Sequence, residues 1–134
     1  MTAYCEFGLE QIPRIWEIYN AAGWTAYLDD RGKLARAFER SLYVLGAFQD
    51  GRMIGFIRCV GDGEHIVYVQ DLVVDKPYQH QGIGKALLQK AREKYPQVRT
   101  FALMTDASDK KANAFYKAMK MRSYENAGLT GYLW

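Results

Sequence analysis

Residues 79–85 combine two glycines with a lysine, and their composition suits the binding of an anion. Gly82 and Gly84 allow the backbone to come close to a ligand. Apolar residues then recur at helical spacing, at Ile83, Ala86, Leu87 and Ala91. The N-terminus of such a helix carries about half a unit of positive charge and unpaired N–H groups, to which Lys85 adds a full charge. We therefore expect this segment to bind a phosphate-containing ligand, most simply a pyrophosphate.

Two common phosphate-binding motifs do not fit the segment. A dinucleotide fingerprint requires a third glycine where Leu87 stands, and a Walker loop requires Ser or Thr where Ala86 stands. The run Gln79-His80-Gln81-Gly82-Ile83-Gly84 instead resembles the Q/R-x-x-G-x-G/A signature of the GCN5-related N-acetyltransferase (GNAT) family. In that family the loop binds the pyrophosphate of coenzyme A, so the resemblance implies acetyl-CoA as cofactor.

The resemblance extends over residues 67–121, because further family features follow in the family's order. Before the loop lies an apolar strand ending in Leu72-Val73-Val74. After the helix come a strand near residues 101–104 and the run Asn113-Ala114-Phe115-Tyr116, with one residue fewer than usual between the asparagine and the aromatic pair. The resemblance implies a mixed α/β fold of the GNAT acyl-CoA N-acyltransferase type, in which a central sheet is flanked by helices.

The family resemblance also implies a role for each matching residue. The backbone of Leu72, Val73 and Val74 should pair with pantetheine, with the Val73 N–H donating to the thioester carbonyl. The pyrophosphate should be held by Gln79, His80, Gln81, Gly82, Ile83, Gly84 and Lys85. Asn113 should reach the cofactor arm, and Tyr116 resembles the family's general acid beside the sulfur. A core tyrosine packed on Phe115 is the alternative for Tyr116.

The chain departs from the family pattern at two places. Many small polyamine-type members carry Glu-Asp before the Leu-x-Val strand end, whereas this chain has Gln70-Asp71, and an amide cannot act as a base. Asp71 could act through a water, but adjacent strand residues face opposite sides, which favours a structural hydrogen-bonding role. Asp62, Glu64 and His65 are weaker candidates for the base.

The second departure is Lys120-Met121, where the family usually has Gly-Phe after its last helix. A residue at that point commonly adopts a left-handed conformation, which a glycine adopts without strain. The lysine must therefore adopt this conformation, or the helix must end differently.

Aromatic residues in the first third of the chain are candidates for the acceptor site. Trp24, Tyr27 and Tyr43 could stack on an aromatic amine or hold an ammonium by cation–π attraction of about 0.5–2 kcal/mol, or could simply be core. The runs Ala22-Gly23-Trp24, Ser41-Leu42-Tyr43 and 70–74 resemble the subgroup that contains plant-type serotonin acetyltransferases and bacterial relatives.

The elements that must position these residues follow from hydrophobic periodicity and turn signals. We expect strand 67–74 to be largely buried on both faces and to run parallel to strand 98–105, because a helix from Gly82 connects them. The other expected elements are strand 4–7, helices 9–22 and 30–40, strands 42–49 and 52–60, helix 110–120, and a terminal pair of strands, 121–124 with 129–134.

Length and composition limit the remaining possibilities. The 134 residues predict a single domain, 1–134, and the net charge of +3 is interleaved with acids, which gives no support for nucleic-acid or membrane binding. Without an apolar run of about 20 residues or a signal peptide, the chain is predicted to be cytoplasmic. Cys5 and Cys59 lack metal-ligand spacing, so no metal is expected and both are predicted to be buried, reduced thiols.

The leading functional hypothesis is an N-acetyltransferase that moves the acetyl group of acetyl-CoA to a primary amine of a small molecule, such as an arylalkylamine or a polyamine, by direct attack. No Ser/His or Cys/His arrangement supports nucleophilic catalysis by the enzyme. The alternatives are a protein lysine or N-terminal acetyltransferase and a catalytically silent acyl-CoA-binding module. The sequence does not indicate the oligomeric state, and a homodimer is compatible with it.

Overall fold

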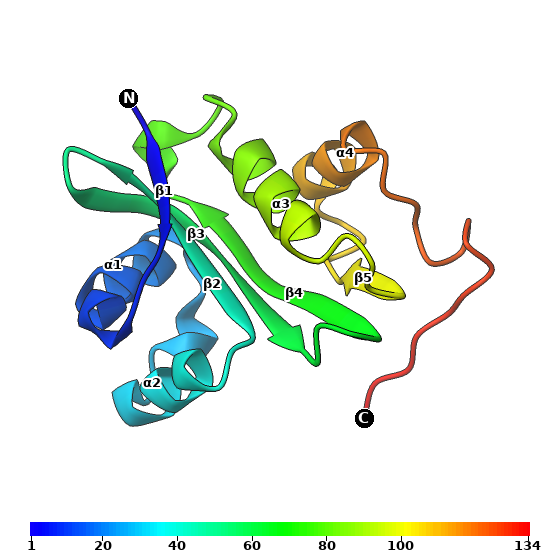
Figure 1. Ribbon diagram of the computed structural model, residues 1–134, viewed down its shortest axis with the longest axis horizontal. Helices are drawn as coiled ribbons and strands as arrows, with labels where there is room; N and C mark the ends of the chain where they lie inside the picture. The colour runs from blue at the N-terminus through cyan, green and yellow to red at the C-terminus, as the bar shows by residue number, and fades with distance from the viewer. The chain divides into compact units, whose positions relative to one another are not determined.

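The computed structural model describes all 134 residues, which form two units, Met1–Leu103 and Met104–Trp134. The first unit is built on a five-stranded sheet whose strands lie in chain order (Figure 1). The strands are β1 (Ala3–Glu6), β2 (Tyr43–Gln49), β3 (Arg52–Gly61), β4 (Ile66–Val74) and β5 (Thr100–Leu103). The first four pair antiparallel, and β5 pairs parallel with β4, which confirms the predicted mixed sheet and the crossover.

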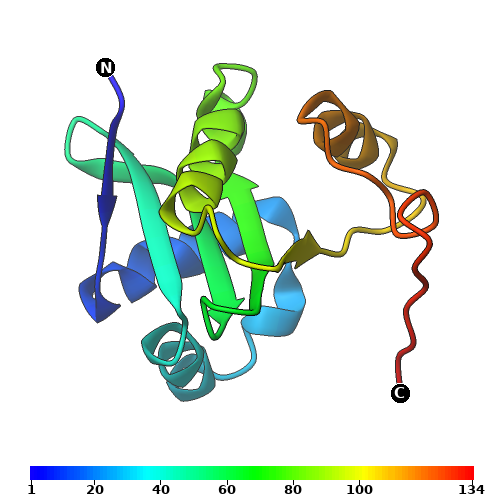
Figure 2. The same cartoon turned by 45° about the vertical axis from the view of Figure 1, so that its right-hand side comes forward.

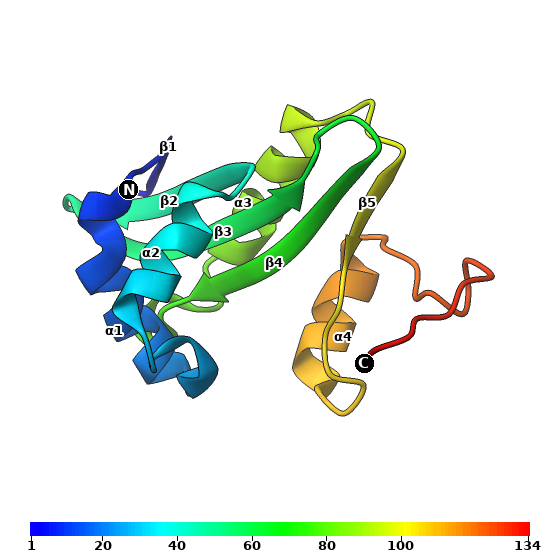
Figure 3. The same cartoon turned by 90° about the horizontal axis from the view of Figure 1, so that it is seen from below.

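Helices cover both faces of this sheet. Helices α1 (Ile12–Ala22) and α2 (Arg31–Glu39) pack on one face, and α3 (Ile83–Lys94) packs on the other (Figure 3). The α1/α2 face carries a core of buried apolar residues from both helices and from β3 and β4: Ile12, Ile15, Ile18, Tyr19, Leu34, Phe38, Met53, Phe56 and Val73. The sheet therefore lies between two apolar layers, one shared with α1 and α2 and the other with α3.

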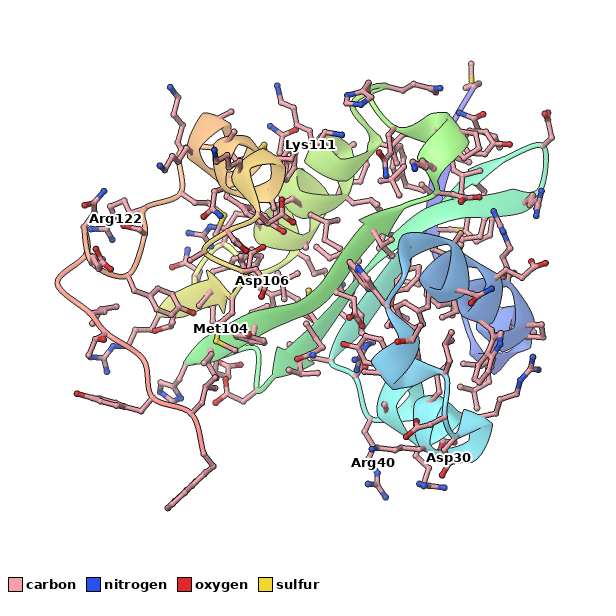
Figure 4. All side chains as sticks on the ribbon, turned by 180° about the vertical axis from the view of Figure 1, so that it is seen from behind. Asp30, Arg40, Met104, Asp106, Lys111 and Arg122 are labelled. Carbon is pink, nitrogen blue, oxygen red and sulfur yellow. The ribbon has the colours of Figure 1, made fainter.

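Local signals explain where the first two helices end and begin. Gly23 follows α1 in the left-handed conformation at φ 78°, which favours glycine, and ends the helix. Asp30, labelled in Figure 4 at the start of α2, caps that helix by accepting a hydrogen bond from the Lys33 N–H at 3.0 Å. Residues 24–29 between them form the connection that carries Trp24 and Tyr27.

A bulge divides β4 into two halves. Arg58 of β3 pairs with Asp71 and Cys59 pairs with Val69, so Gln70 is an extra residue without a partner. Paired residues share a face of the sheet, which places Val69 with Cys59 on the α3 side but Asp71 with Arg58 on the α1/α2 side. The odd-numbered residues are buried both before and after the bulge, but they face the α3 side before it and the α1/α2 side after it. The prediction that the strand is buried on both faces is therefore wrong, because each half buries only one face fully.

The ladder between β4 and β5 is short. It begins at Ile66↔Thr100 and ends at Val69↔Leu103. Residues 70–74 of β4 thus extend beyond the last residue of β5 in this unit, while their other edge remains paired with β3. This segment is the part of the sheet that offers an edge to a ligand.

The second unit contains one helix, α4 (Lys110–Ala118), which Asp109 caps by accepting from the Ala112 N–H at 3.0 Å. Lys120 follows α4 at φ 68°. The lysine therefore adopts the left-handed conformation that the family's usual glycine would adopt without strain. The predicted terminal strands, residues 121–124 and 129–134, are absent (Figure 2). The Tyr124 carbonyl accepts from the Ala127 and Leu129 N–H groups, so this backbone forms local turns instead of a ladder.

The two cysteines differ in environment. Cys59 lies buried in β3, as predicted, whereas Cys5 is exposed because β1 is the edge strand and is mostly accessible. Both are free thiols. None of the helices has the length and apolar character required to cross a membrane.

Candidate acyl-transfer site

The loop before α3 leaves a helix N-terminus open. Gly82 precedes the helix at φ 79°, a left-handed conformation that favours glycine, and no side chain caps the helix at this residue. The first bond within the helix runs from the Ala86 N–H to the Gly82 carbonyl at 3.0 Å. The N–H groups of Ile83, Gly84 and Lys85 therefore precede the helical ladder and are the ones that an anion would meet.

Side chains in this loop divide between solvent and the protein. Gln81 and Lys85 are exposed, and His80 is exposed in a left-handed conformation at φ 65°. Ile83 is only 3% exposed and anchors the helix in the core, so its contribution to a ligand would come from its backbone. Gln79 donates from Nε2 to the Val74 carbonyl at 3.0 Å, which ties the loop to the end of β4.

The strand end itself is held firmly against its neighbour. The Asp75 N–H donates to the Ile54 carbonyl at 2.8 Å, and the Asp75 carboxylate pairs with Arg14 at 2.8 Å. A Cβ atom at Gly55 would lie 2.8 Å from the Val73 carbonyl oxygen, so glycine is needed there for the two strands to approach. Leu72, Val73 and Val74 thus present one fixed backbone edge beyond β5.

A cavity of about 300 Å³ lies between the end of α1 and the second half of β4. Its lining comes from α1, the following connection, β4 and the turn after it: Ile18, Ala21, Ala22, Trp24, Leu72, Val73, Val74, Asp75, Lys76 and Gln79. A volume at the lower end of the range for ligand pockets suits a small molecule or the reactive end of a cofactor. The cavity brings one predicted acceptor residue, Trp24, together with the predicted cofactor strand.

Asp71 is the centre of a buried polar cluster beneath this region. Its side chain lies on the α1/α2 side and the residue is 2% exposed. Oδ2 accepts from the Tyr19 hydroxyl at 2.7 Å and from Arg58 Nε at 2.6 Å, and Oδ1 accepts from the Tyr27 hydroxyl at 2.7 Å. With three donors on two oxygens, Asp71 has the structural role that the sequence favoured.

Burial and the charge of Asp71 change the pKa values of the residues around it. Burial, followed by the field of Asp71, raises the pKa of Tyr19. Burial also raises the pKa of Tyr27, against the opposing hydrogen bond from Gln70 and with the support of Asp71, so both hydroxyls stay protonated near neutral pH. Burial alone would lower the pKa of Arg58, but the charge of Asp71 and its hydrogen bond outweigh burial and the pKa is raised. The cluster is therefore a fixed ion pair with two neutral phenols.

Gln70 and Asp71 both hydrogen-bond to the Tyr27 hydroxyl, although they are adjacent in a strand. Gln70 is exposed, and its Nε2 donates to the Tyr27 oxygen at 2.9 Å. The bulge at Gln70 removes the strict alternation of faces, so the premise that adjacent residues must face opposite sides is wrong here.

The three predicted acceptor-site aromatics do not gather in one place. Tyr27 stacks on Tyr19 with ring centroids 4.5 Å apart, and Trp24 stacks on the same ring at 5.8 Å. Tyr43 instead lies buried on the α3 side, where its ring meets Tyr95 edge-on at 5.9 Å. Tyr43 pairs with Cys59 across the strands, and that register assigns it to the α3 face. This placement agrees with the alternative that Tyr43 is a core residue.

The weaker candidates for a base are part of an exposed turn. Asp62 Oδ1 accepts from the N–H groups of Glu64, His65 and Ile66. These bonds, led by the one from Ile66, lower the pKa of Asp62 to about 2. Asp62 therefore builds the turn between β3 and β4, with His65 3.7 Å from its other oxygen.

Asn113 and Tyr116 belong to the second unit, and their cofactor roles stay predictions. Asn113 donates from Nδ2 to the carbonyls of Asp106 and Asp109, at 2.9 and 2.7 Å, so only its Oδ1 is left for another partner. The Tyr116 ring meets Phe115 edge-on at 5.1 Å. Burial, followed by the charge of Asp109, raises the pKa of Tyr116, which keeps its hydroxyl protonated at neutral pH.

Sequence reasoning missed two members of the Asp71 cluster. Tyr19 lies in the predicted helix 9–22, and the apolar spacing of that helix fits its buried ring but gives its hydroxyl no role. Arg58 is the only charged residue between Met53 and Val60, and a charge within an apolar strand was a signal that a buried partner should exist.

Comparison with known proteins agrees with this architecture. The model of the acetyltransferase (GNAT) family matches residues 9–121. A GNAT-family acetyltransferase from Streptococcus pneumoniae TIGR4 is similar at 30% identity and a TM-score of 0.87, over 100% of this chain and 97% of that one.

Two more distant structures share the fold. PaiA N-acetyltransferase from Thermoplasma acidophilum, solved in complex with coenzyme A, is 20% identical with a TM-score of 0.75, over 89% of this chain and 88% of that one. An aminoglycoside acetyltransferase from an uncultured soil metagenomic sample, solved in complex with sisomicin, is 18% identical with a TM-score of 0.74, over 99% and 95%.

Proposed function

The chain belongs to the GNAT family of acetyltransferases and is an acetyl-CoA-dependent N-acetyltransferase, and we propose that its acceptor is a primary amine of a small molecule. The observation that carries this proposal is the cavity of about 300 Å³ beside residues 72–74, with Trp24 in its wall. Its volume suits a small acceptor better than an extended peptide. The Trp24 ring in this wall favours an arylalkylamine within this class.

The open features of the first unit fit the cofactor. The uncapped N-terminus of α3 and Lys85 would hold the pyrophosphate, and the edge of β4 beyond β5 would pair with the pantetheine amides. When bound, acetyl-CoA supplies an activated acetyl group on a thioester. The Asp75 N–H donates to Ile54 of β3, and N–H groups alternate in direction along a strand, so the Val73 N–H also faces β3. The Leu72 and Val74 N–H groups face the open edge, and they are our candidates to stabilise the negative charge that develops on the thioester oxygen. Tyr116 is our candidate to donate a proton to the departing sulfur.

No enzyme-bound acetyl group is needed for this reaction. The amine attacks the thioester carbon directly, so the chain has to bind a neutral amine, exclude competing water and orient the two reactants. Gln70 and Asp71 stand where many relatives have Glu-Asp. Asp71 already forms an ion pair with Arg58 and accepts hydrogen bonds from two tyrosines. We propose that the amine loses its proton to solvent before it reacts.

We further propose that the enzyme acts in the cytoplasm. Both of its cysteines are free, and free thiols persist in reducing compartments. This supports the assignment and does not bear on the choice of acceptor.

A panel of acceptors tests the proposal. Purified protein is incubated with acetyl-CoA and, separately, with arylalkylamines, polyamines, a lysine peptide and a peptide with a free N-terminus, and both thiol release and product mass are followed. We expect the arylalkylamines to give the highest kcat/KM. Trp24→Leu should lower that value, while Trp16→Leu, a matched change of a tryptophan outside the cavity lining, should not. Acetylation of the peptides with no small amine modified would overturn the proposal.

A further inference from the structure

The hydrogen bonds between Gln70, Tyr27 and Asp71 form a chain with a fixed direction. A tyrosine hydroxyl has one hydrogen to donate, and Tyr27 directs it to Asp71 Oδ1 at 2.7 Å. The Tyr27 oxygen can then only accept from its other neighbour, and Gln70 lies 2.9 Å away. The NH₂ group of Gln70, and not its carbonyl, must therefore face Tyr27.

Asp71, at the buried end of this series of hydrogen bonds, fixes the donor-to-acceptor direction of the series. Asp71 receives donors from Tyr19, Arg58 and Tyr27, the pattern of an ionised carboxylate that can only accept. These are the titratable groups that face it from α1, β3 and the α1–α2 connection. The pKa values of both tyrosines and of Arg58 are raised, so none of the three loses its proton near neutral pH.

The orientation leaves one atom of Gln70 free for a ligand. Gln70 is exposed at the bulge, at the start of the β4 segment that extends beyond β5 and two residues before Leu72, and its Oε1 is the atom turned away from Tyr27. We infer that Gln70 Oε1 accepts a hydrogen bond from the amine nitrogen of the acetyl acceptor, and that Tyr27 is the residue that positions it. The inference rests on the proposed function, since it assigns an amine contact to a residue of β4 that lies two positions before Leu72 of the cavity lining.

A carbonyl acceptor at this place supplies no negative charge to offset the positive charge of an ammonium. Asp75 is the only carboxylate that lines the cavity, and Arg14 pairs with it at 2.8 Å, while Lys76 adds a positive charge. Desolvating an ammonium without an opposite charge is costly. The cavity lining therefore disfavours polyamines and strongly basic alkylammonium ions, and it favours amines that are weakly basic enough to be neutral near pH 7.

A matched pair of substrates tests the selectivity. 2-Phenylethylamine and its 2,2-difluoro analogue are similar in size, but fluorine lowers the amine pKa. At pH 7 we expect a higher kcat/KM for the difluoro compound, because its larger neutral fraction outweighs its weaker nucleophilicity. A higher value for the parent amine at pH 7 would overturn the inference.

A double-mutant cycle tests the positioning role of Tyr27. Gln70→Met keeps the length of the side chain but removes both polar atoms, and with the weakly basic amine it should lower kcat/KM about fivefold, mainly through KM. Tyr27→Phe should lower it about threefold, and the double variant should be no worse than Gln70→Met, because the two changes remove one interaction. Tyr95→Phe is the matched control on the α3 side. Fully additive losses would mean that Tyr27 is merely structural and would contradict the inference.

A spectroscopic readout separates this inference from the proposed function. The side-chain NH₂ resonances of Gln70 in a ¹⁵N-labelled protein should shift and exchange faster with water in Tyr27→Phe but not in Tyr95→Phe. Unchanged resonances in Tyr27→Phe would refute the orientation of Gln70, whatever the enzyme acetylates. Failure of every small amine in the panel, with the resonances behaving as expected, would instead refute the proposed function and with it the amine contact.

Discussion

Gln70 determines how the rate should depend on pH. At pH 7 an alkylamine with a pKa near 10 is neutral in only about one molecule per thousand, and this fraction rises roughly tenfold per pH unit. With no carboxylate at this position to take the proton, kcat/KM for such an amine should climb toward about pH 9 without a plateau between about pH 6 and 8. A rate profile measured with acetyl-CoA saturating would show this. A profile already flat above about pH 7 would indicate an enzymic base.

Restoring a carboxylate at the same position should change the substrate preference. Gln70→Glu places a negative charge on the exposed side of the bulge, where it can attract an alkylammonium and accept its proton. We expect kcat/KM for an alkylamine at pH 7 to rise, by about tenfold or more. Gln70→Met, which adds no charge, is the control. No gain in Gln70→Glu would mean that the deprotonation step does not take place near Gln70.

Tyr116 is predicted to protonate the leaving thiolate of coenzyme A. Its hydroxyl stays protonated at neutral pH because burial and Asp109 raise its pKa. Tyr116→Phe removes only that hydroxyl and should lower kcat by roughly 10²–10⁴-fold, the scale of general acid catalysis, while the Kd for acetyl-CoA stays nearly the same. Steady-state kinetics at saturating amine, together with calorimetry, give both quantities. Unchanged turnover would leave Tyr116 as a packing partner of Phe115.

At the scale of elements, the start of α3 carries the prediction for cofactor binding. Gly84→Glu adds bulk and negative charge in the first turn, where the open N–H groups would meet the pyrophosphate. We expect calorimetry to detect no coenzyme A binding to this variant. Gly32→Glu is a matched control, because Gly32 is likewise the second residue of a helix, α2, and is exposed. Unchanged affinity in Gly84→Glu would disprove the assignment of residues 79–85.

Elements were predictable from sequence where a local pattern decides them. The glycines before α3, the two-residue turn between predicted strands 42–49 and 52–60, and predicted helix 9–22 all depend on patterns a few residues long, and the structure has an element at each place. The bulge at Gln70 was not predictable, because it depends on the register between β3 and β4. The face on which Tyr43 lies was not predictable for the same reason, since pairing with Cys59 determines it.

The predicted terminal strands failed for a related reason. Residues 121–124 and 129–134 contain aromatic and apolar residues typical of strands, but a strand also needs a partner for its backbone. Gly128 at φ 77° and the bonds to the Tyr124 carbonyl satisfy that backbone locally. Composition alone does not distinguish these two outcomes.

At the scale of the whole molecule, the two cysteines offer a built-in measure of unfolding. Burial raises the pKa of the Cys59 thiol to about 12, and the residue is inaccessible in the middle of the sheet. An unfolded cysteine has a pKa near 8.5, so at pH 8 about a quarter of it is reactive thiolate. Cys5 is exposed and should be alkylated quickly in the folded protein. Cys59 should react only when the sheet opens.

Alkylation of Cys59 should therefore report cofactor binding. A ligand that binds only the folded state lowers the population of open molecules, by about 100-fold at 100 times its Kd. In Cys5→Ser, which leaves Cys59 as the single thiol, we expect acetyl-CoA at that concentration to slow alkylation by iodoacetamide about 100-fold, as followed by mass spectrometry. Gly84→Glu in the same background should show no such protection, because it cannot hold the pyrophosphate. Rapid labelling of Cys59 without ligand would contradict its burial. Equal protection in both backgrounds would mean that acetyl-CoA stabilises the sheet without using the N-terminus of α3.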